Sequence, residues 1–249
     1  MMRLEVIGGI ARLLIDRPLK RNAMTTAMFE AIPGLIAEAE AKHHVRAIVL
    51  MSARPGMFCA GADIGELSAN AADTDWRQRN QLAINLAQHR LARADRPVIA
   101  FIDGDCVGGG CGMALACDIR VATTRSRFGI TPAKLGLVYP LHDTKLLVDL
   151  VGPGQAKRIL FTGALLTAEE ALRIGLIDMI ADSPDELAHS IAANSLHSQR
   201  QSKAMVRRIL DGQTGDDAET LAIFAQAFEG SDFGEGVSAF LDKRKPDFK

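Results

Sequence analysis

Residues 108–118 read GGGCGMALACD, three glycines that lead into a short apolar run predicted to form a buried helix. The strand-like run PVIAFID (residues 97–103) precedes this stretch, and the strand-like run IRVATT (residues 119–124) follows it. The first backbone N–H groups of a helix have no partner within the helix, and glycine lets a ligand come close to them. The stretch therefore predicts a strand, a glycine loop and a helix whose first amides can bind a phosphate or an oxyanion.

The same order of elements occurs once before in the chain. RAIVLMSA (residues 46–53) is predicted to be a strand, a loop ending in FCAGA follows, and DIGEL opens a helix with Asp63 as its N-cap. The two units lie about 50 residues apart, a spacing that suggests an internal repeat. If the units stack, two helix N-termini point at one place, and two converging amides are what an oxyanion hole requires.

The sequence divides into two predicted regions, a core and a C-terminal helical region. LEVIG and IARLLID, around Gly8 and Gly9, are predicted to form a hairpin at the start of a core spanning residues 1–183. Residues 184–249 contain three amphipathic helical patterns and no constellation of catalytic side chains. We expect this second region to be a helical appendage that docks on a neighbouring subunit.

Composition excludes several classes of function. The 249 residues carry a net charge of −1, which predicts neither nucleic-acid nor membrane-surface binding. No apolar run approaches the roughly 20 residues that span a bilayer. The four cysteines form no CxxC pair and no zinc spacing, so we expect reduced thiols, a cytoplasmic protein and no metal site.

Two other ligand classes fit the glycine stretch poorly. A P-loop needs Gly-Lys-Ser/Thr, which is absent from the sequence. The dinucleotide fingerprint GxGxxG finds Gly108 and Gly110 but then Met113, and no acidic residue ends the next strand. Glycines that merely relieve crowding between helix and strand remain the alternative, but the twin loop FCAGAD favours an oxyanion hole.

Several motifs in order carry a family resemblance: RPLKRNAMT, FCAGADI, the GGGC loop followed by LACDIRVAT, FGITPAKLGL, and VGPGQAKRILFTGALLTAEEALRIGLID. From about Arg17 to Asp178 the chain resembles the crotonase superfamily, the enoyl-CoA hydratase/isomerase family. The resemblance implies an α/β fold, a crotonase-like spiral of repeated ββα units with a C-terminal α-helical trimerisation region. It also implies an acyl-CoA thioester substrate, a homotrimer or dimer of trimers, and no cofactor, because CoA arrives with the substrate.

The resemblance also assigns roles by position. The amides of Ala62 and Gly109 would form an oxyanion hole that stabilises a thioester enolate. The CoA-binding positions would be Arg21, Ala23, Ala60, Asp63, Ile64 and Gly110.

Two residues depart from the family's pattern. Hydratases of this family use two glutamates to add water, and here Gly112 and Pro132 stand at those positions. Neither residue can transfer a proton, and such groups typically contribute about 10²- to 10⁴-fold each to the rate. We therefore expect an enzyme of this family that retains enolate stabilisation but hydrates poorly.

Tyr139, the only tyrosine, suggests another reaction. The stretch TPAKLGLVYP resembles methylmalonyl-CoA decarboxylases of the same superfamily, in which this tyrosine is implicated in the site. Those relatives keep an acid at the Gly112 position and a histidine near Ala62, both absent here. The reactions that stay open are therefore decarboxylation, isomerisation and thioester hydrolysis, and a non-catalytic acyl-CoA binder also stays open. The alternative for Tyr139 is a structural residue that lines the site and whose hydroxyl is hydrogen-bonded.

Four other polar residues have a structural and a functional interpretation. His142 and Asp143 could be a proton donor and its orienting carboxylate, or the start of a helix capped by Asp143. Glu66 suits the first turn of its helix, and we expect Cys111 to be a core residue rather than a nucleophile.

Overall fold

The computed structural model describes residues 1–248 and opens with the predicted hairpin. Strands β1 (Met2–Ile7) and β2 (Ile10–Ile15) pair antiparallel, with Ile7 opposite Ile10. Gly8 and Gly9 form the turn with φ angles of 57° and 79°. Two successive positive φ values are what a tight hairpin turn of matching twist needs, and glycine adopts them without strain.

Three ββα units follow, and each contributes one strand to each of two sheets. The first unit contains β3 (Ala47–Ser52), β4 (Met57–Cys59), α2 (Ile64–Ala69) and α3 (Thr74–Ala92). The second contains β5 (Val98–Ile102), β6 (Asp105–Val107) and α4 (Gly109–Leu115). The third contains β7 (Ile119–Ala122), β8 (Arg127–Gly129), the 3₁₀ helix η2 (Pro132–Leu135) and α5 (Leu141–Thr162). The six-stranded sheet has the order β1-β2-β3-β5-β7-β10, and the four-stranded sheet has the order β4-β6-β8-β9. This regular alternation is the predicted spiral of ββα units.

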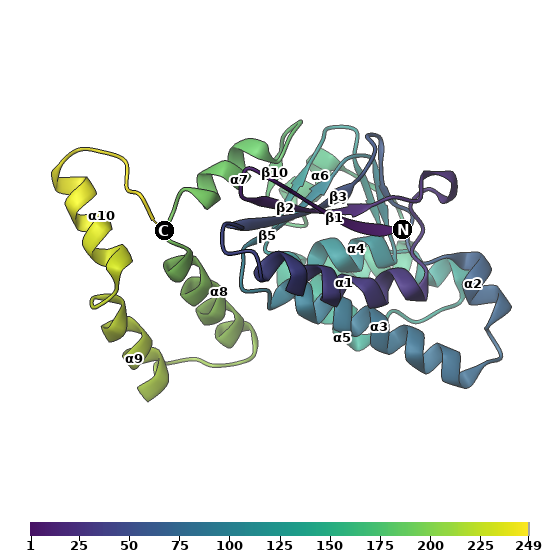
Figure 1. Ribbon diagram of the computed structural model, residues 1–249. Coiled ribbons are helices and arrows are strands. Elements are labelled where there is room, and N and C mark those ends of the chain that lie inside the picture. Colours follow the sequence, from purple (N-terminus) through teal and green to yellow (C-terminus); the bar gives the residue numbers. More distant parts are fainter. Residues whose placement is uncertain (249) are drawn as a thin grey trace.

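The main core lies between the six-stranded sheet and α1 (Thr26–Glu40), α3, α4 and α5, which lie on one side of it (Figure 1). On β3, Ile48 and Leu50 join this core, whereas Ala47 and Val49 face a second cluster with Ala188. Ala188 belongs to α7 (Asp185–Ala192), which packs on the other face of the sheet. Strands buried on both faces explain the continuous apolar runs in the sequence.

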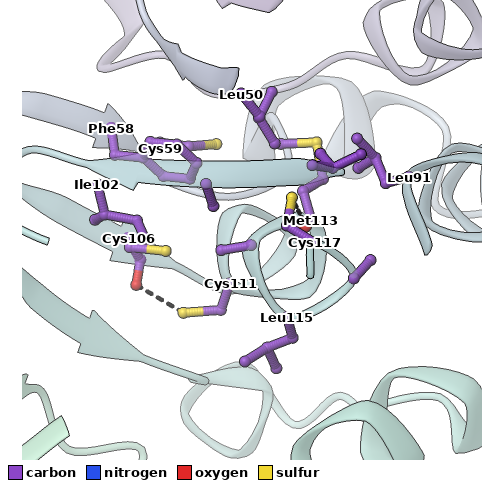
Figure 2. Packing of buried hydrophobic residues seen from close by; sticks show 14 of the residues in the cluster. Leu50, Phe58, Cys59, Leu91, Ile102, Cys106, Cys111, Met113, Leu115 and Cys117 are labelled. Atoms are coloured by element: carbon purple, nitrogen blue, oxygen red, sulfur yellow. Dashed lines mark hydrogen bonds between the residues drawn. The ribbon is translucent and has the colours of Figure 1, made fainter. Parts of the chain in front are cut away.

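Buried cysteine side chains lie on α4 and next to it (Figure 2). Cys59, Cys106, Cys111 and Cys117 are all free and buried, and the Cys111 thiol donates to the Cys106 carbonyl at 2.8 Å. Burial raises the pKa of the Cys59 thiol to about 12. Buried cysteines of this kind act as small apolar residues, so Cys111 packs in the core as expected.

The remaining elements complete the second sheet and extend the chain away from the core. They are η1 (Pro18–Lys20), β9 (Leu166–Thr167), α6 (Ala168–Arg173), β10 (Met179–Ile180), α8 (Leu196–Leu210), α9 (Ala218–Ala227) and α10 (Ser231–Leu241). Helices α8, α9 and α10 lie to one side of the sheets (Figure 1). The boundary between residues 183 and 184 stays a prediction. Within residues 1–248, no helix is both long and apolar enough to cross a bilayer.

Candidate functional site

The four-stranded sheet brings the two glycine loops together. Strands β4 and β6 are parallel neighbours, with Cys59 opposite Cys106. Both strands therefore end at the same edge of the sheet, where Ala60 continues one chain segment and Gly108 the other. The loop after β4 leads into α2, and the loop after β6 leads directly into α4.

Two unpaired backbone amides meet at this edge. Gly61 has a φ of 101°, and a Cβ added there would lie 3.5 Å from the amide nitrogen of Gly109. A Cβ added to Gly109 would in turn lie 3.5 Å from the amide nitrogen of Ala62. Among the hydrogen bonds of residues 1–248, none uses the N–H of Ala62 or of Gly109. The two residues predicted to form an oxyanion hole are thus adjacent and present free donors.

The residues predicted to bind CoA form a strip beside these amides. The Ala60 N–H donates to the Arg21 carbonyl at 3.0 Å, and the Asp63 N–H donates to the Met24 carbonyl at 2.8 Å. Ala23 lies between Arg21 and Met24, and Ile64 follows Asp63 and is 55% exposed. Gly110 differs, because it is buried and a Cβ there would lie 2.7 Å from the Cβ of Cys59. It therefore allows α4 to pack closely on β4, and the binding roles stay predictions.

Arg17, the first residue of the RPLKRNAMT motif, connects the two segments of this strip. Its guanidinium bonds to the Asp63 carboxylate and donates to the Ala23 carbonyl at 2.9 Å. This partner holds the pKa of Asp63 below its usual value. Asp63 also accepts from the Glu66 N–H at 3.1 Å, which confirms it as the N-cap of α2.

Asn22, also in the RPLKRNAMT motif, is a second positioning residue, and the motif alone did not reveal this role. It is buried with a φ of 55°, a left-handed conformation that asparagine tolerates better than most residues. Its amide donates to Ser52 Oγ at 2.9 Å and to the carbonyls of Phe58 and Met57 at 3.0 and 3.1 Å. These contacts tie the loop of Arg21 and Ala23 to the end of β4.

We expect Asn22→Ala to lower the free energy of unfolding by about 2–4 kcal/mol, because buried carbonyls lose their donor. Urea denaturation measures this loss. Arg54→Ala is a matched control, since Arg54 is exposed in the neighbouring loop. If Asn22→Ala unfolds at the same urea concentration as the wild type, Asn22 does not hold the loop.

Polar side chains fill the space beside Gly112, where the family resemblance predicts a glutamate in hydratases. A Cβ added there would overlap Gln88 Nε2 and lie 2.7 Å from Asp143 Oδ1 and 3.3 Å from the Tyr139 hydroxyl. Gln88 Nε2 donates to Asp143 Oδ1 at 2.6 Å. The structure therefore brings the predicted Tyr139 to the site, together with Asp143 and with Gln88, which the sequence analysis missed. A single glutamine in a polar helix gives no sequence signal.

The cluster around Gly112 is buried and incompletely hydrogen-bonded. Burial raises the pKa of Asp143, and burial together with the nearby Asp143 carboxyl raises the pKa of Tyr139 well above its usual value. The Tyr139 hydroxyl, Gln88 Oε1 and His142 Nε2 are buried and have no partner in the described part of the chain. Such orphaned groups are costly in a folded protein, so they indicate a place prepared for a ligand or water.

The structural alternative for Asp143 needs a correction. The N-cap of α5 is Pro140, which makes no side-chain cap bond, and Asp143 lies within the first turn. His142 and Asp143 share no hydrogen bond in residues 1–248, so His142 is not oriented by this carboxylate. Asp143 thus is neither the cap nor the partner of His142.

Two acidic residues near the glycine loops, Glu66 and Asp105, have structural partners. Glu66 Oε2 accepts from the Thr26 N–H at 2.9 Å, at the first residue of α1. Asp105 accepts from Arg127 and Arg21, each at 2.8 Å in its shortest contact. Pro132 begins η2, where its missing N–H does no harm. The described residues contain no group of three or more His, Cys, Asp or Glu that could hold a metal.

A cavity of about 700 Å³ lies at the C-terminal end of α4, opposite to the two amides. Its walls include Leu115 of α4, Leu146 and Leu150 of α5 and Val206 of α8. Because the amides of Ala62 and Gly109 lie at the N-terminal end of α4, this cavity does not enclose them.

Comparisons with known proteins agree with the fold. Residues 5–249 match the family model for enoyl-CoA hydratase/isomerase. The chain is 33% identical to a short-chain-enoyl-CoA hydratase of Clostridium acetobutylicum, covering 97% of this chain and 95% of that protein. It is also 33% identical to a crotonyl-CoA hydratase of Syntrophomonas wolfei, covering 98% and 96%. A crystal structure of an enoyl-CoA hydratase/isomerase family protein from Hyphomonas neptunium is 42% identical, with a TM-score of 0.95 over 100% of this chain and 97% of that one.

Proposed function

Because this chain belongs to the enoyl-CoA hydratase/isomerase family, we propose that the amides of Ala62 and Gly109 bind the thioester oxygen of an acyl-CoA and stabilise its enolate. The observation that carries the proposal is the pair of adjacent, unpaired N–H groups at the ends of β4 and β6. Their position at the positive end of the α4 dipole favours negative charge on the bound oxygen.

The proposed chemistry follows from what two amides can do. When a proton or a carboxylate leaves the carbon beside the thioester carbonyl, its electron pair spreads onto the carbonyl oxygen. Fixed donors aimed at that oxygen lower the barrier, and each is worth about 10²- to 10³-fold in kcat. No metal or further cofactor is needed for this step, because CoA enters with the substrate.

The residues at the hydratase positions argue against efficient hydration. Gly112 and Pro132 carry no acid or base, and Gln88 and Asp143 occupy the space at Gly112. Decarboxylation is a second candidate, supported by the unpaired Tyr139 hydroxyl in the same cluster. There the bond to the leaving carboxylate breaks, carbon dioxide departs, and the enolate carbon takes up a proton.

Thermal unfolding with and without ligand tests substrate binding first. A butyryl-CoA concentration 100 times its Kd stabilises the folded state by about 2.7 kcal/mol, which raises Tm by roughly 5–10 °C. NAD at the same concentration is the control, and we expect it to leave Tm unchanged. A Tm that no CoA ester raises would remove acyl-CoA from the proposal.

The C-terminal helices support an oligomer. Phe224 and Phe240, on α9 and α10, are 67% and 83% exposed, and exposed aromatic surface of this kind favours association. We propose a homotrimer or a dimer of trimers, whose mass light scattering would measure in solution. The four free, buried thiols support a cytoplasmic location, which is part of the proposal.

A further inference from the structure

Gly112 is not simply a lost side chain, because other residues use its space. Gln88 reaches it from α3 and Asp143 from the first turn of α5, and both are almost completely buried. Asp143 Oδ1 lies 2.7 Å from the point where a Cβ on Gly112 would stand. Any side chain at this position would displace the pair, so Gly112 and the Gln88–Asp143 pair form one arrangement.

This arrangement lies on the same face of α4 as the proposed oxyanion hole. Gly112 follows Gly109 by three residues, and residues so spaced are neighbours on a helix, with Cβ atoms about 5–6 Å apart. The Asp143 carboxyl lies 2.7 Å from the Cβ position of Gly112, and that position is about one helical turn after Gly109. That separation suits a group that acts on the carbon atoms attached to a carbonyl whose oxygen is bound there.

The chemistry of the cluster is that of a proton donor and acceptor. Burial favours the neutral form of the Asp143 carboxyl, whereas the hydrogen bond from Gln88 favours the ionised form and offsets part of this shift in pKa. Gln88 Oε1 is buried beside it without a partner in residues 1–248, and the Tyr139 hydroxyl lies next to the Asp143 carboxyl. A cluster that keeps a buried polar atom unpaired does not serve stability alone.

We propose that Asp143, positioned by Gln88, transfers a proton to and from the carbon beside the thioester carbonyl, in place of a side chain at Gly112. The inference rests on the proposed function, because the oxyanion hole must hold the enolate. In the donating direction the Asp143 O–H bond breaks and a C–H bond forms with the enolate electron pair. The carboxylate that remains takes its next proton from solvent, or from the substrate in the reverse direction.

Deuterium uptake by butyryl-CoA in D₂O tests this step without knowledge of the natural acyl group. The wild type should exchange the hydrogens beside the thioester, and mass spectrometry follows the gain in mass. Asp143→Asn keeps the shape of the side chain and should lower kcat for exchange by about 10²- to 10⁴-fold. KM and the Tm rise caused by butyryl-CoA should change little, because the oxyanion hole remains.

Two matched variants complete the test. Asp149→Asn makes the same change on the same helix, where Asp149 pairs with the surface residue Lys145, and should exchange as the wild type does. Gln88→Met removes the hydrogen bond to Asp143 and should lower kcat less than Asp143→Asn does. Asp143→Asn should not lower Tm at pH 7, because a carboxyl whose folded pKa is raised does not stabilise the fold above its ordinary pKa.

The results that would contradict the role of Asp143 differ from those that would contradict the proposed function. Exchange at the wild-type rate in Asp143→Asn overturns the role of Asp143 and leaves the proposed function intact. Lost exchange together with a lower Tm also overturns it, because Asp143 would then be a structural residue of α5. No exchange by the wild type, with no rise in Tm on adding butyryl-CoA, overturns the proposed function and this inference with it.

Discussion

Gly109→Pro should lower kcat by about 10²- to 10³-fold while the protein stays folded. Proline removes the N–H that we assign to the oxyanion hole. Gly109 is the first residue of α4, the helix position that accepts proline best, because its N–H has no partner within the helix. A Cβ at Gly109 makes only ordinary contacts, at 3.5 Å from Phe29 Cζ and from the Ala62 nitrogen. Steady-state kinetics and circular dichroism on the same preparation measure the two effects.

Gly109→Ala is the control for this variant, because it adds the same Cβ but keeps the amide. It should lose far less activity than Gly109→Pro. Equal losses in both would mean that crowding matters and the N–H does not. Wild-type kcat in a folded Gly109→Pro variant would remove Gly109 from the oxyanion hole.

Gly112→Glu, which restores the residue typical of hydratases, should not produce a crotonyl-CoA hydratase. The new side chain must displace Gln88 and Asp143 from a buried site, and overpacking of this kind typically costs about 1–3 kcal/mol. Tm should fall by roughly 2–10 °C, and turnover of the enzyme's own thioester should fall with it. Calorimetry and an assay of water addition to crotonyl-CoA check the two parts.

Gln88→Ala combined with Gly112→Glu is the informative comparison for the second variant. Removing the glutamine side chain should relieve the overlap at Gly112, so the double variant should be more stable than the two separate losses predict. Strictly additive losses would show that Gln88 does not compete for this space. Efficient hydration by Gly112→Glu alone would mean that the site lacks only a glutamate.

Much of the fold could be predicted because local sequence patterns indicate it. Gly8 and Gly9 mark the hairpin, and the repeated order of strand, glycine loop and helix marks the ββα units. The assignment of Ala62 and Gly109 came from the family resemblance, and the structure places the two residues side by side because both loops follow parallel strands of one sheet. The division into two sheets was not visible, because β4, β6 and β8 have only three residues each.

The polar part of the site depends on contacts between distant segments. Gln88 and Asp143 are 55 residues apart, and nothing near either residue announces the other. Asp143 resembled a helix cap because aspartate is one of the preferred N-cap residues. Asn22 and Arg17 lie in the RPLKRNAMT motif, but the motif did not reveal their positioning roles, since their partners lie on β4 and at the start of α2.

Mass spectrometry of CoA esters incubated with the purified protein tests whether the protein converts an acyl-CoA through an enolate. The panel is crotonyl-CoA, a 3-enoyl-CoA, malonyl-type thioesters and 3-hydroxyacyl-CoA, with chromatography for the isomerisation, which leaves the mass unchanged. We expect a conversion that passes through an enolate, as loss of carbon dioxide or a shifted double bond, and no gain of water on crotonyl-CoA. Rapid gain of water on crotonyl-CoA, or no change in any ester, would contradict it.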